Sequence, residues 1–322
     1  MTQAETRPTM HAVSQSAAGG PEVLALVRTG RPEPIAGEIL VRVHAAGVNP
    51  SDWKTRSRGW FADGTRPPFT LGHDVSGVVE AVGRGVTVFR PGDEVFGMPR
   101  FPHPGGAYAE YVTAPARHFA PRPEGIDHVQ AAALPLAALT AWQALVDTAG
   151  VRPGQRVLIH AAAGGVGHLA VQIAKARGAH VIGTASAGKH DLLRSLGADE
   201  LVDHRTRDFA RAVRDVDVVL DAVGGSTWAG SVRVLRPGGT LVSILPLDET
   251  FPAEEAEAAR VRAVFMLVEP DRQALREIGA LVEDGRLRVV VEKVFPLKDA
   301  AAAHTLGERG RTTGKIVLAV AP

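Results

Sequence analysis

Short apolar runs separated by turns fill the first part of the chain. β-Branched residues alternate or cluster in these runs, and turn sequences such as Gly19-Gly20-Pro21 stand between them. This pattern predicts β-strands at 23–27, 39–44, 75–82, 86–89, 94–96 and 108–112. Because only turns separate these strands, we expect a compact β-rich domain over residues 1–124.

The pattern changes near residue 125. Residues 127–150 are rich in Ala and Leu and predict helices, with Pro135 at a start or a kink. Strands are then expected at 156–160, 180–184, 216–220, 240–244 and 261–267, and helices at 167–177, 189–196 and 271–284. This alternation predicts a parallel sheet with helices on both faces over 125–285, and residues 286–322 return to the mixed character of the first domain. The predicted fold class is therefore α/β, with a β-rich domain and a doubly wound domain.

Composition agrees with two domains and excludes several kinds of chemistry. The chain has 322 residues, more than one hydrophobic core usually holds. Its 36 Lys and Arg against 35 Asp and Glu give a net charge of +1, so no overall field favours nucleic acid or an anionic membrane. The absence of cysteine removes disulfides, thiolate nucleophiles and thiolate metal ligands. No apolar run is long enough to span a membrane, and residues 1–8 are polar, so we expect a cytoplasmic protein.

A glycine-rich segment follows the predicted strand at 156–160. Gly165, Gly167 and Ala170 have the spacing Gly-x-Gly-x-x-Ala at the start of the predicted helix 167–177. Glycines at these positions let backbone N–H groups approach a pyrophosphate, which the helix N-terminus then faces. An ordinary βα loop would carry similar glycines, but strand, loop, helix and next strand occur in the order that a dinucleotide site requires. We therefore predict a nicotinamide dinucleotide site.

The end of the next predicted strand indicates which cofactor binds. An Asp or Glu there would accept the ribose hydroxyls of NAD, and this chain has none in its segment 184–189. Instead, Thr184, Ser186 and Lys189 offer hydroxyls and an ammonium that suit a 2′-phosphate. His204 or Arg205 could add charge. The alternative is that Ser186 caps a helix and Lys189 is only solvated. We favour NADPH over NADH.

Several ordered blocks resemble the medium-chain dehydrogenase/reductase superfamily, and within it the zinc-free quinone oxidoreductase branch, which is zeta-crystallin-like. The blocks are GVNPSD at 47–52, LGHDVSGVV at 71–79, PGDEV at 91–95, LTA at 139–141, the glycine loop, LGAD at 196–199 and GKIVL at 314–318. They extend over almost the whole chain. The resemblance implies a GroES-like catalytic domain made from residues 1–124 and 286–322, with a Rossmann coenzyme domain over 125–285.

The resemblance also implies roles for individual residues. The expected catalytic residues are Asn49, Asp52 and Thr140, of which Asn49 and Thr140 contact the nicotinamide. The remaining cofactor contacts are Gly164, Gly165, Val166 and Gly167 at the pyrophosphate, Thr184, Ser186, Lys189 and His204 toward the adenosine phosphate, and Val223, Leu245, Met266 and Lys315 along the cofactor. At position 204 the family often has Tyr.

Zinc alcohol dehydrogenases of the same superfamily bind their catalytic metal through a Cys and a His-Glu pair. This chain has Val48-Asn49 and His73-Asp74 at those positions, too few protein ligands for a catalytic zinc, so we predict no metal. Reduction of a quinone or an α,β-unsaturated carbonyl by hydride needs no Lewis acid. We therefore expect NADPH-dependent reduction of such an acceptor, with an enoyl thioester as the alternative substrate.

The proton donor for this reduction is left open. Water or a nearby hydroxyl would serve, but Tyr108 and Tyr111 are more simply explained by packing. For Asp52, helix capping or a structural hydrogen bond is as strong an explanation as acid catalysis.

Four aromatic residues in predicted loops could cover a planar acceptor. They are Trp53, Trp60, Phe61 and Phe101, and the alternative is that some of them cover the core. Arg56, Arg58, Arg66 and Arg100 in the same region are expected on the surface. The apolar segment 261–268 is expected to be an edge strand of the Rossmann sheet, and the resemblance implies a homodimer through it.

A different class of function is an NADPH-binding sensor, structural protein or RNA-binding protein of the same fold. Neutral net charge and the lack of a basic, aromatic-interleaved stretch argue against nucleic acid. A zinc alcohol dehydrogenase is the least favoured reading.

Overall fold

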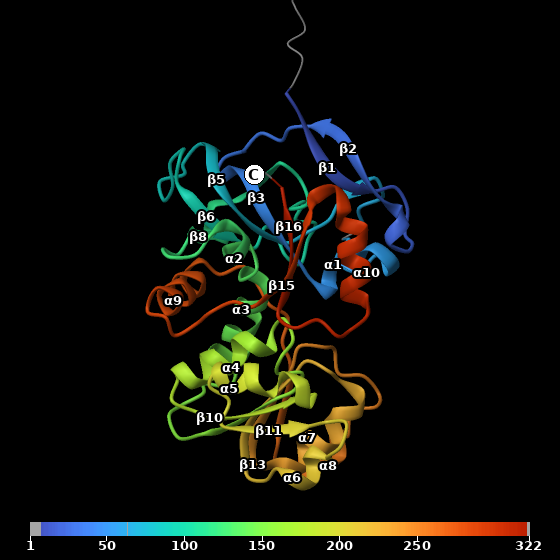
Figure 1. The fold of residues 1–322 in the computed structure, drawn as a ribbon, viewed down its shortest axis with the longest axis vertical. Helices are drawn as coiled ribbons and strands as arrows, with labels where there is room; N and C mark the ends of the chain where they lie inside the picture. The colour runs from blue at the N-terminus through green and yellow to red at the C-terminus, as the bar shows by residue number, and fades with distance from the viewer. Residues whose placement is uncertain (1–7, 63, 321–322) are drawn as a thin grey trace, which may run out of the picture. The chain divides into compact units, whose positions relative to one another are not determined.

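The computed structural model describes residues 8–62 and 64–320, and the chain divides into two compact units (Figure 1). Unit 1 contains Met1–Leu136, Glu269–Glu283 and Val291–Pro322, and unit 2 contains Ala137–Val268 and Asp284–Val290. Most of the predicted polar leader lies outside the described residues. By packing, the segment 125–136 and the helix α9 (Arg272–Glu283) belong to unit 1, where α9 contacts strand β8 (Phe119–Pro121).

Unit 1 is built on two sheets. The larger has the order β15-β16-β3-β5-β6-β8, with β7 also paired to β3, and the smaller has the order β2-β1-β4. The strands are β1 (Thr9–Gln15), β2 (Leu24–Gly30), β3 (Glu38–Val48), β4 (Phe69–Thr70), β5 (Asp74–Val82), β6 (Glu94–Gly97), β7 (Tyr111–Pro115), β8 (Phe119–Pro121), β15 (Val291–Pro296) and β16 (Lys315–Ala319). The helices are α1 (Pro50–Arg58), α2 (His128–Ala132), α9 and α10 (Ala300–Glu308), with short 3-10 turns at Pro21–Val23, Ala116–His118 and Leu297–Asp299.

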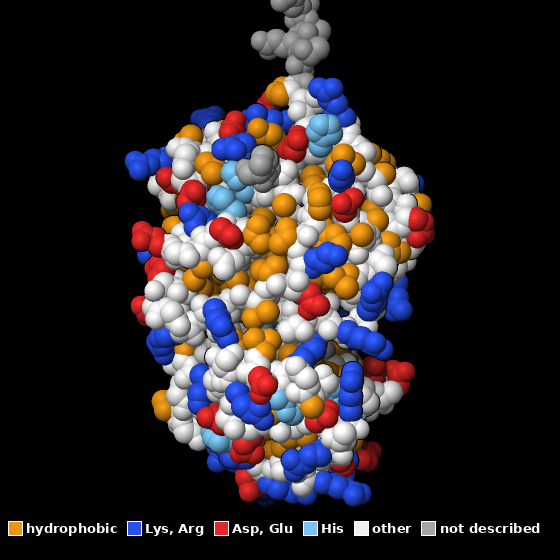
Figure 2. All heavy atoms as spheres, in the orientation of Figure 1, with side chains coloured by type: hydrophobic (Ala, Val, Ile, Leu, Met, Phe, Trp, Pro, Cys, Tyr) orange, Lys and Arg blue, Asp and Glu red, His pale blue; other side chains and the backbone are white. Residues whose placement is uncertain are grey.

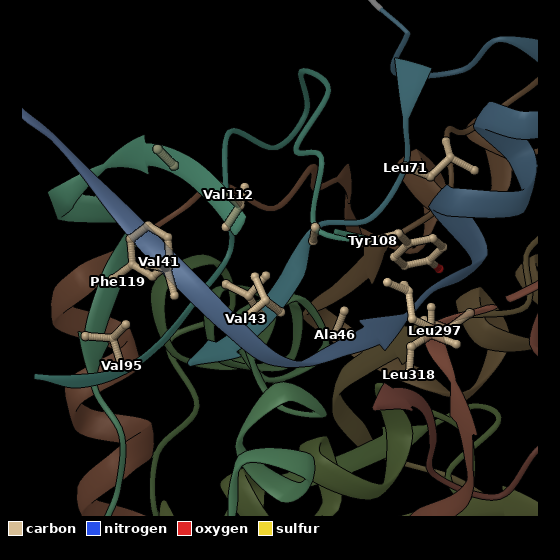
Figure 3. Packing of buried hydrophobic residues seen from close by; sticks show 14 of the residues in the cluster. Val41, Val43, Ala46, Leu71, Val95, Tyr108, Val112, Phe119, Leu297 and Leu318 are labelled. Carbon is tan, nitrogen blue, oxygen red and sulfur yellow. The ribbon is translucent and has the colours of Figure 1, made fainter. Parts of the chain in front are cut away.

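The core of unit 1 lies along the long strand β3. Val41, Val43 and Ala46 point into a cluster that Leu318 of β16 and the ring of Tyr108 complete (Figure 3). All five side chains are fully buried. Burial of this apolar surface is the main source of stability for the unit, and it fixes the strand ends from which the polar residues described below emerge.

Some predicted elements of unit 1 need correction. The strand expected at 86–89 does not form, because β5 pairs with β6 and the residues 86–89 form a loop whose apolar side chains pack on the core. The strand expected at 108–112 starts later, at Tyr111. Strand β1 and helix α1 were not predicted, since β1 mixes polar and apolar residues and α1 is strongly polar.

Unit 2 is a parallel six-stranded sheet with helices. Its order, β11-β10-β9-β12-β13-β14, is the 3-2-1-4-5-6 order of a Rossmann fold, which confirms the predicted doubly wound domain. The strands are β9 (Arg156–Ile159), β10 (His180–Ala185), β11 (Glu200–Asp203), β12 (Val216–Asp221), β13 (Leu235–Ser243) and β14 (Arg262–Phe265). Helix α3 (Pro135–Trp142) leads into the unit and continues as a π-helical turn (Gln143–Thr148). The other helices are α4 (Gly167–Ala176), α5 (His190–Ser195), α6 (Phe209–Ala212), α7 (Trp228–Val234) and α8 (Ala253–Ala258), with 3-10 turns at Ala187–Lys189 and Gly225–Thr227.

Strand order reverses between β9 and β12, and the crevice at the carboxyl ends of such strands is where ligands bind in open α/β sheets. At the far side, β14 pairs only with β13 among the described strands, so the predicted edge strand is confirmed. Phe265 and Leu267 there are each 42% exposed. The homodimer through this edge stays a prediction.

The surface carries mixed charge. On the face drawn in Figure 2, Lys and Arg side chains are interspersed with Asp and Glu, as the near-zero net charge suggests. Among the described residues, no helix combines the length and the apolar character needed to cross a bilayer.

Candidate active-site residues

The glycine loop joins β9 to α4 with very little space between backbone segments. A Cβ atom on Gly167 would lie 2.3 Å from the carbonyl oxygen of Ala161, so only glycine fits there. Helix α4 begins at this glycine, and no side chain caps it. The N–H groups of His168 and Leu169 already donate to Gly164 O at 3.1 Å and to Val166 O at 3.2 Å, so it is the positive end of the helix dipole, together with the glycine loop before it, that suits an anion. The segment Gly164 to Gly167, predicted to hold the pyrophosphate, fits that group.

A buried histidine directly after β9 links neighbouring elements of unit 2 through hydrogen bonds. His160 Nδ1 lies 3.1 Å from the hydroxyl of Thr184, and its Nε2 lies 3.0 Å from the hydroxyl of Ser231. Thr184 in turn accepts the N–H of Ala161 at the start of the loop. Burial lowers the pKa of His160 to about 4, so the ring is neutral at physiological pH. Thr184, which is predicted to bind the cofactor, therefore holds the start of the glycine loop through its hydroxyl group.

The loop after β12 is held by a buried carboxylate. Asp221 accepts the N–H groups of Val223 at 2.8 Å and Gly224 at 2.9 Å, and the hydroxyl of Thr227 at 2.6 Å. Val223 is 44% exposed at the carboxyl end of the sheet. Leu245 follows the end of β13 and Met266 follows the end of β14. The three residues predicted to line the cofactor thus all follow strand ends on one edge of the sheet.

The predicted adenosine end lies after β10 and β11. Ser186 makes no side-chain cap bond to the turn that follows it, so the capping alternative does not hold here. His204 and Arg205 are exposed in the turn after β11. Sequence reasoning missed Asp203, which stands opposite Ala185 in the β10–β11 register and accepts the N–H of Arg205. That hydrogen bond is the main cause of a lowered pKa for Asp203, so an ionised acid lies near the proposed phosphate ligands.

In unit 1, three buried polar groups meet where β3 and β16 pair. Asn49 donates from its amide to Asp74 Oδ2 at 2.8 Å, while Lys315 Nζ donates to the amide oxygen of Asn49 and, at 3.0 Å, to Asp74 Oδ2. Asp74 Oδ1 also accepts the N–H of Leu136 in the first turn of α3 at 2.7 Å. Hydrogen bonds therefore fix both the amide nitrogen and the amide oxygen of the Asn49 side chain. The cofactor contacts predicted for Asn49 and Lys315 stay predictions, as does that of Thr140, which is buried in α3.

Asp52 is fully buried in the first turn of α1. Its Oδ2 accepts the N–H of Asn49 at 2.8 Å and the hydroxyl of Tyr108 at 2.9 Å, and its Oδ1 lies 3.2 Å from His73 Nδ1. Burial works to raise the pKa of Asp52, but the hydrogen bond and charge of His73 hold it below the usual value. Burial beside Asp52 raises the pKa of Tyr108 well above its ordinary value, so this phenol stays protonated.

Arg56 was expected on the surface, and that prediction is wrong. Its side chain is buried because the guanidinium bonds to Gly19 O at 3.0 Å, His304 Nδ1 at 2.9 Å and Glu308 Oε1 at 2.6 Å. His304 Nε2 lies 3.2 Å from the Tyr108 hydroxyl, which links Arg56 to Asp52. None of these partners is near Arg56 in sequence, so no local pattern indicated the network.

Three of the four predicted pocket aromatics form a row beside His73. The ring of Phe101 meets His73 edge-on at 5.1 Å, Phe61 lies 5.0 Å from Phe101, and Trp60 lies 6.3 Å from Phe61. Trp53 is elsewhere, with its ring 6.2 Å from His304 and packed on α10. The row Trp60, Phe61 and Phe101 is the part of the predicted pocket that the structure brings together.

His73 also bears on the prediction of no metal. Its two ring nitrogens face Asp52 and, at 3.2 Å, the carbonyl oxygen of His103. Within 8–62 and 64–320, no group of three His, Asp or Glu side chains is arranged to hold a metal ion.

Two parts of the chain match known families. Residues 35–124 match the alcohol dehydrogenase GroES-like domain, and residues 196–318 match the zinc-binding dehydrogenases.

Similar proteins extend over nearly the whole chain. The spectinabilin polyketide synthase system protein NorB of Streptomyces orinoci is 42% identical over 95% of this chain, which spans only 14% of that protein. The structure of the quinone oxidoreductase from Coxiella burnetii is 39% identical, with a TM-score of 0.92, and the match covers 98% of this chain and 100% of that one. The structure of CurK enoyl reductase is 31% identical, with a TM-score of 0.86, over 96% of this chain and 99% of that one.

Two neutral buried histidines should make folding sensitive to acid. Burial lowers the pKa of His160 and of His304 from 6.5 to about 4, so the unfolded chain binds more protons than the folded chain between these values. The contribution of the two histidines to the free energy of unfolding is then fully present above pH 6.5 and is lost as the pH drops toward 4. We expect each histidine to contribute roughly 2 to 3 kcal/mol to this loss.

Urea unfolding at pH 7.0 and pH 5.0 checks this expectation. His304→Gln should lose less stability over this interval than the wild type, whereas His11→Gln, at an exposed side chain, should keep the wild-type difference. An equal pH dependence in His304→Gln and the wild type would contradict the assignment.

Proposed function

We propose that this chain, which belongs to the medium-chain dehydrogenase/reductase superfamily and within it to the quinone oxidoreductase branch, reduces a quinone or an α,β-unsaturated carbonyl with NADPH. The observation that carries the proposal is the glycine loop on a sheet of Rossmann order, in a chain that matches a quinone oxidoreductase over its full length. A nicotinamide cofactor, when bound, supplies the hydride, and the protein supplies binding, orientation and electrostatics.

The preference for NADPH is supported by the residues after β10. Ser186 has a hydroxyl that makes no cap bond, and Lys189 lies in the turn that directly follows. No acid occurs in the segment 184–189, so nothing within it repels a 2′-phosphate. Asp203, opposite Ala185, already accepts the N–H of Arg205 and a hydrogen bond from the side chain of Thr206.

Catalysis without zinc is supported by how the possible ligands are used. The chain has no cysteine, and Val48-Asn49 stands where zinc alcohol dehydrogenases have their metal-binding Cys. Asp52 and the His103 carbonyl occupy both nitrogens of His73. Hydride addition to a quinone or enone places negative charge on oxygen, where hydrogen bonds suffice to stabilise it.

A planar acceptor is favoured by the aromatic row. Phe101 is buried against His73, Phe61 is half-buried against Phe101, and Trp60, which is 38% exposed, continues the row to the surface. Aromatic walls of this kind bind flat conjugated molecules through apolar contact and stacking.

Reduction of an enoyl thioester is a second candidate. The specific observation in its favour is the full-length match to CurK enoyl reductase. The chemistry is the same conjugate addition of hydride, and only the group attached to the carbonyl differs.

The direct test follows NADPH absorbance with chelator-treated protein and a panel of quinones, enones, enoyl thioesters and alcohols. We expect turnover of quinones or enones, weaker or no turnover of enoyl thioesters, and none of alcohols with NADP⁺. Activity only with alcohols, restored by zinc, would contradict the proposal. Turnover of enoyl thioesters alone would favour the second candidate.

Cofactor preference has its own test. Lys189→Ala should raise KM for NADPH by roughly tenfold, because a charge-assisted bond to phosphate is worth about 1.5 kcal/mol or more. The KM for NADH should not change. Lys298→Ala, which removes an exposed lysine from unit 1, is the matched control and should leave both values unchanged. An equal rise for NADPH and NADH would contradict a contact with the 2′-phosphate.

A further inference from the structure

The peptide between Gly164 and Gly165 lies in the middle of the glycine loop and has no Cβ atom on either side to restrict its rotation. The Gly164 carbonyl oxygen accepts the backbone N–H of His168 at 3.1 Å and lies 2.9 Å from Nδ1 of the His168 ring. Because this peptide bond is trans, the N–H of Gly165 points away from that carbonyl oxygen. The hydrogen bonds to Gly164 therefore set the direction of the Gly165 N–H.

A second contact decides which ring nitrogen of His168 carries the hydrogen. The backbone N–H of Val290 donates to His168 Nε2 at 3.2 Å, so Nε2 is an acceptor and has no hydrogen of its own. The ring hydrogen is then on Nδ1, which donates it to the Gly164 carbonyl. Both hydrogen bonds require the same tautomer. The side chain is fully buried, so water does not compete for either bond.

The segment that holds this ring runs along α4. Asp284–Val290 belongs to unit 2, although the chain on either side of it belongs to unit 1. Arg286 donates to the Ala176 carbonyl at 2.8 Å, and the N–H and C=O of Arg288 both bond to the Gln172 side-chain amide at 2.9 Å. Steps of two residues in the segment thus match steps of four residues in α4. This register fits an extended chain beside a helix, since both steps are about 6 to 7 Å long.

We propose that His168, held by Val290, is a positioning residue for the cofactor pyrophosphate, because it directs the Gly165 N–H toward the phosphate oxygens. The inference rests on the proposed function, since it needs a dinucleotide at the glycine loop. Among the residues that the structure describes, the N–H groups of Gly165, Val166 and Gly167 donate to no acceptor of the chain. They are therefore available to an anion, and His168 orients the first of them. Both nicotinamide cofactors contain the pyrophosphate, so His168 should act on NADPH and NADH alike.

Two substitutions separate the roles of the two ring nitrogens. In His168→Asn, the side-chain amide can replace Nδ1 as the donor to Gly164, but it is too short to reach Val290. In His168→Gln, the longer side chain can replace Nε2 as the acceptor for Val290, but it leaves Gly164 without a side-chain donor. A ring that only anchors the segment 284–290 makes His168→Gln the milder change. A ring that positions the Gly164–Gly165 peptide makes His168→Asn the milder change.

The first test is cofactor affinity, measured by calorimetric titration. In His168→Gln, Kd should rise about fivefold for NADPH and for NADH, which is the usual contribution of one hydrogen bond. In His168→Asn, both values should stay within about twofold of the wild type. Adenosine 2′-monophosphate has no pyrophosphate and should bind all three proteins equally, which also shows that the variants are folded. The KM for the acceptor should not change in either variant.

A second measurement needs neither a variant nor a cofactor. In ¹⁵N spectra of the wild-type protein, the ring assigned to His168 should carry its hydrogen on Nδ1 only. A hydrogen on Nε2 is incompatible with acceptance of the Val290 N–H and would leave the Gly164 carbonyl without its side-chain donor. That result would overturn the role of His168 whatever the variants do.

The outcomes separate the two proposals. Wild-type protein that binds neither NADPH nor NADH overturns the proposed function, and with it this role for His168. A wild type that binds cofactor, with a His168→Gln of unchanged affinity or with His168→Asn as the weaker binder, overturns the role of His168 alone. A rise in Kd for NADPH without one for NADH also overturns it, because that pattern indicates the 2′-phosphate and is the one expected for Lys189→Ala.

Discussion

Two buried carboxylates in unit 1 are the constraint on which the site depends. Asp74 accepts hydrogen bonds from Asn49 at the β3–α1 junction, from Lys315 of β16 and from a backbone N–H in the first turn of α3. Asp52 contacts the Tyr108 hydroxyl and the His73 ring. It also accepts the backbone N–H of Asn49, the N-cap residue of α1. Burying two ionised carboxylates is unfavourable unless each is fully hydrogen-bonded. The segments that satisfy them are therefore held in fixed positions, and the Asn49 carboxamide and the His73 ring are fixed with them.

In unit 2, buried polar side chains likewise hold the backbone in place, here at the loops that are expected to bind the dinucleotide. Asp221 is buried and holds the loop after β12, and the neutral His160 holds the glycine loop after β9 to the neighbouring strand. These loops follow the two strands between which the sheet order reverses. The backbone that is expected to meet a dinucleotide is thus rigid before any ligand arrives, which reduces the entropy lost on binding.

The sequence predicted much of this because some of its signals are local. Alternation of strands and helices predicted the doubly wound sheet, and the spacing of Gly165 and Gly167 predicted the loop at its switch point. The network of Arg56, Tyr108 and His304 could not be predicted, since its members come from α1, a loop and α10. An acid at the last position of an apolar strand, as Asp221 is in β12, was an available signal that was missed. Asp203 was missed because its strand, β11, is short and only half apolar.

One measurement tests the central claim, that the chain passes hydride from a nicotinamide to a conjugated acceptor without metal. Chelator-treated protein would be mixed with NADPH that carries deuterium at both C4 positions and a cyclic enone for a single turnover, and the product analysed by mass spectrometry and NMR. The account predicts one deuterium at the β-carbon and a solvent-derived proton at the α-carbon. Oxidation of the cofactor with no deuterium in the product, or no reaction until zinc is added, would contradict it.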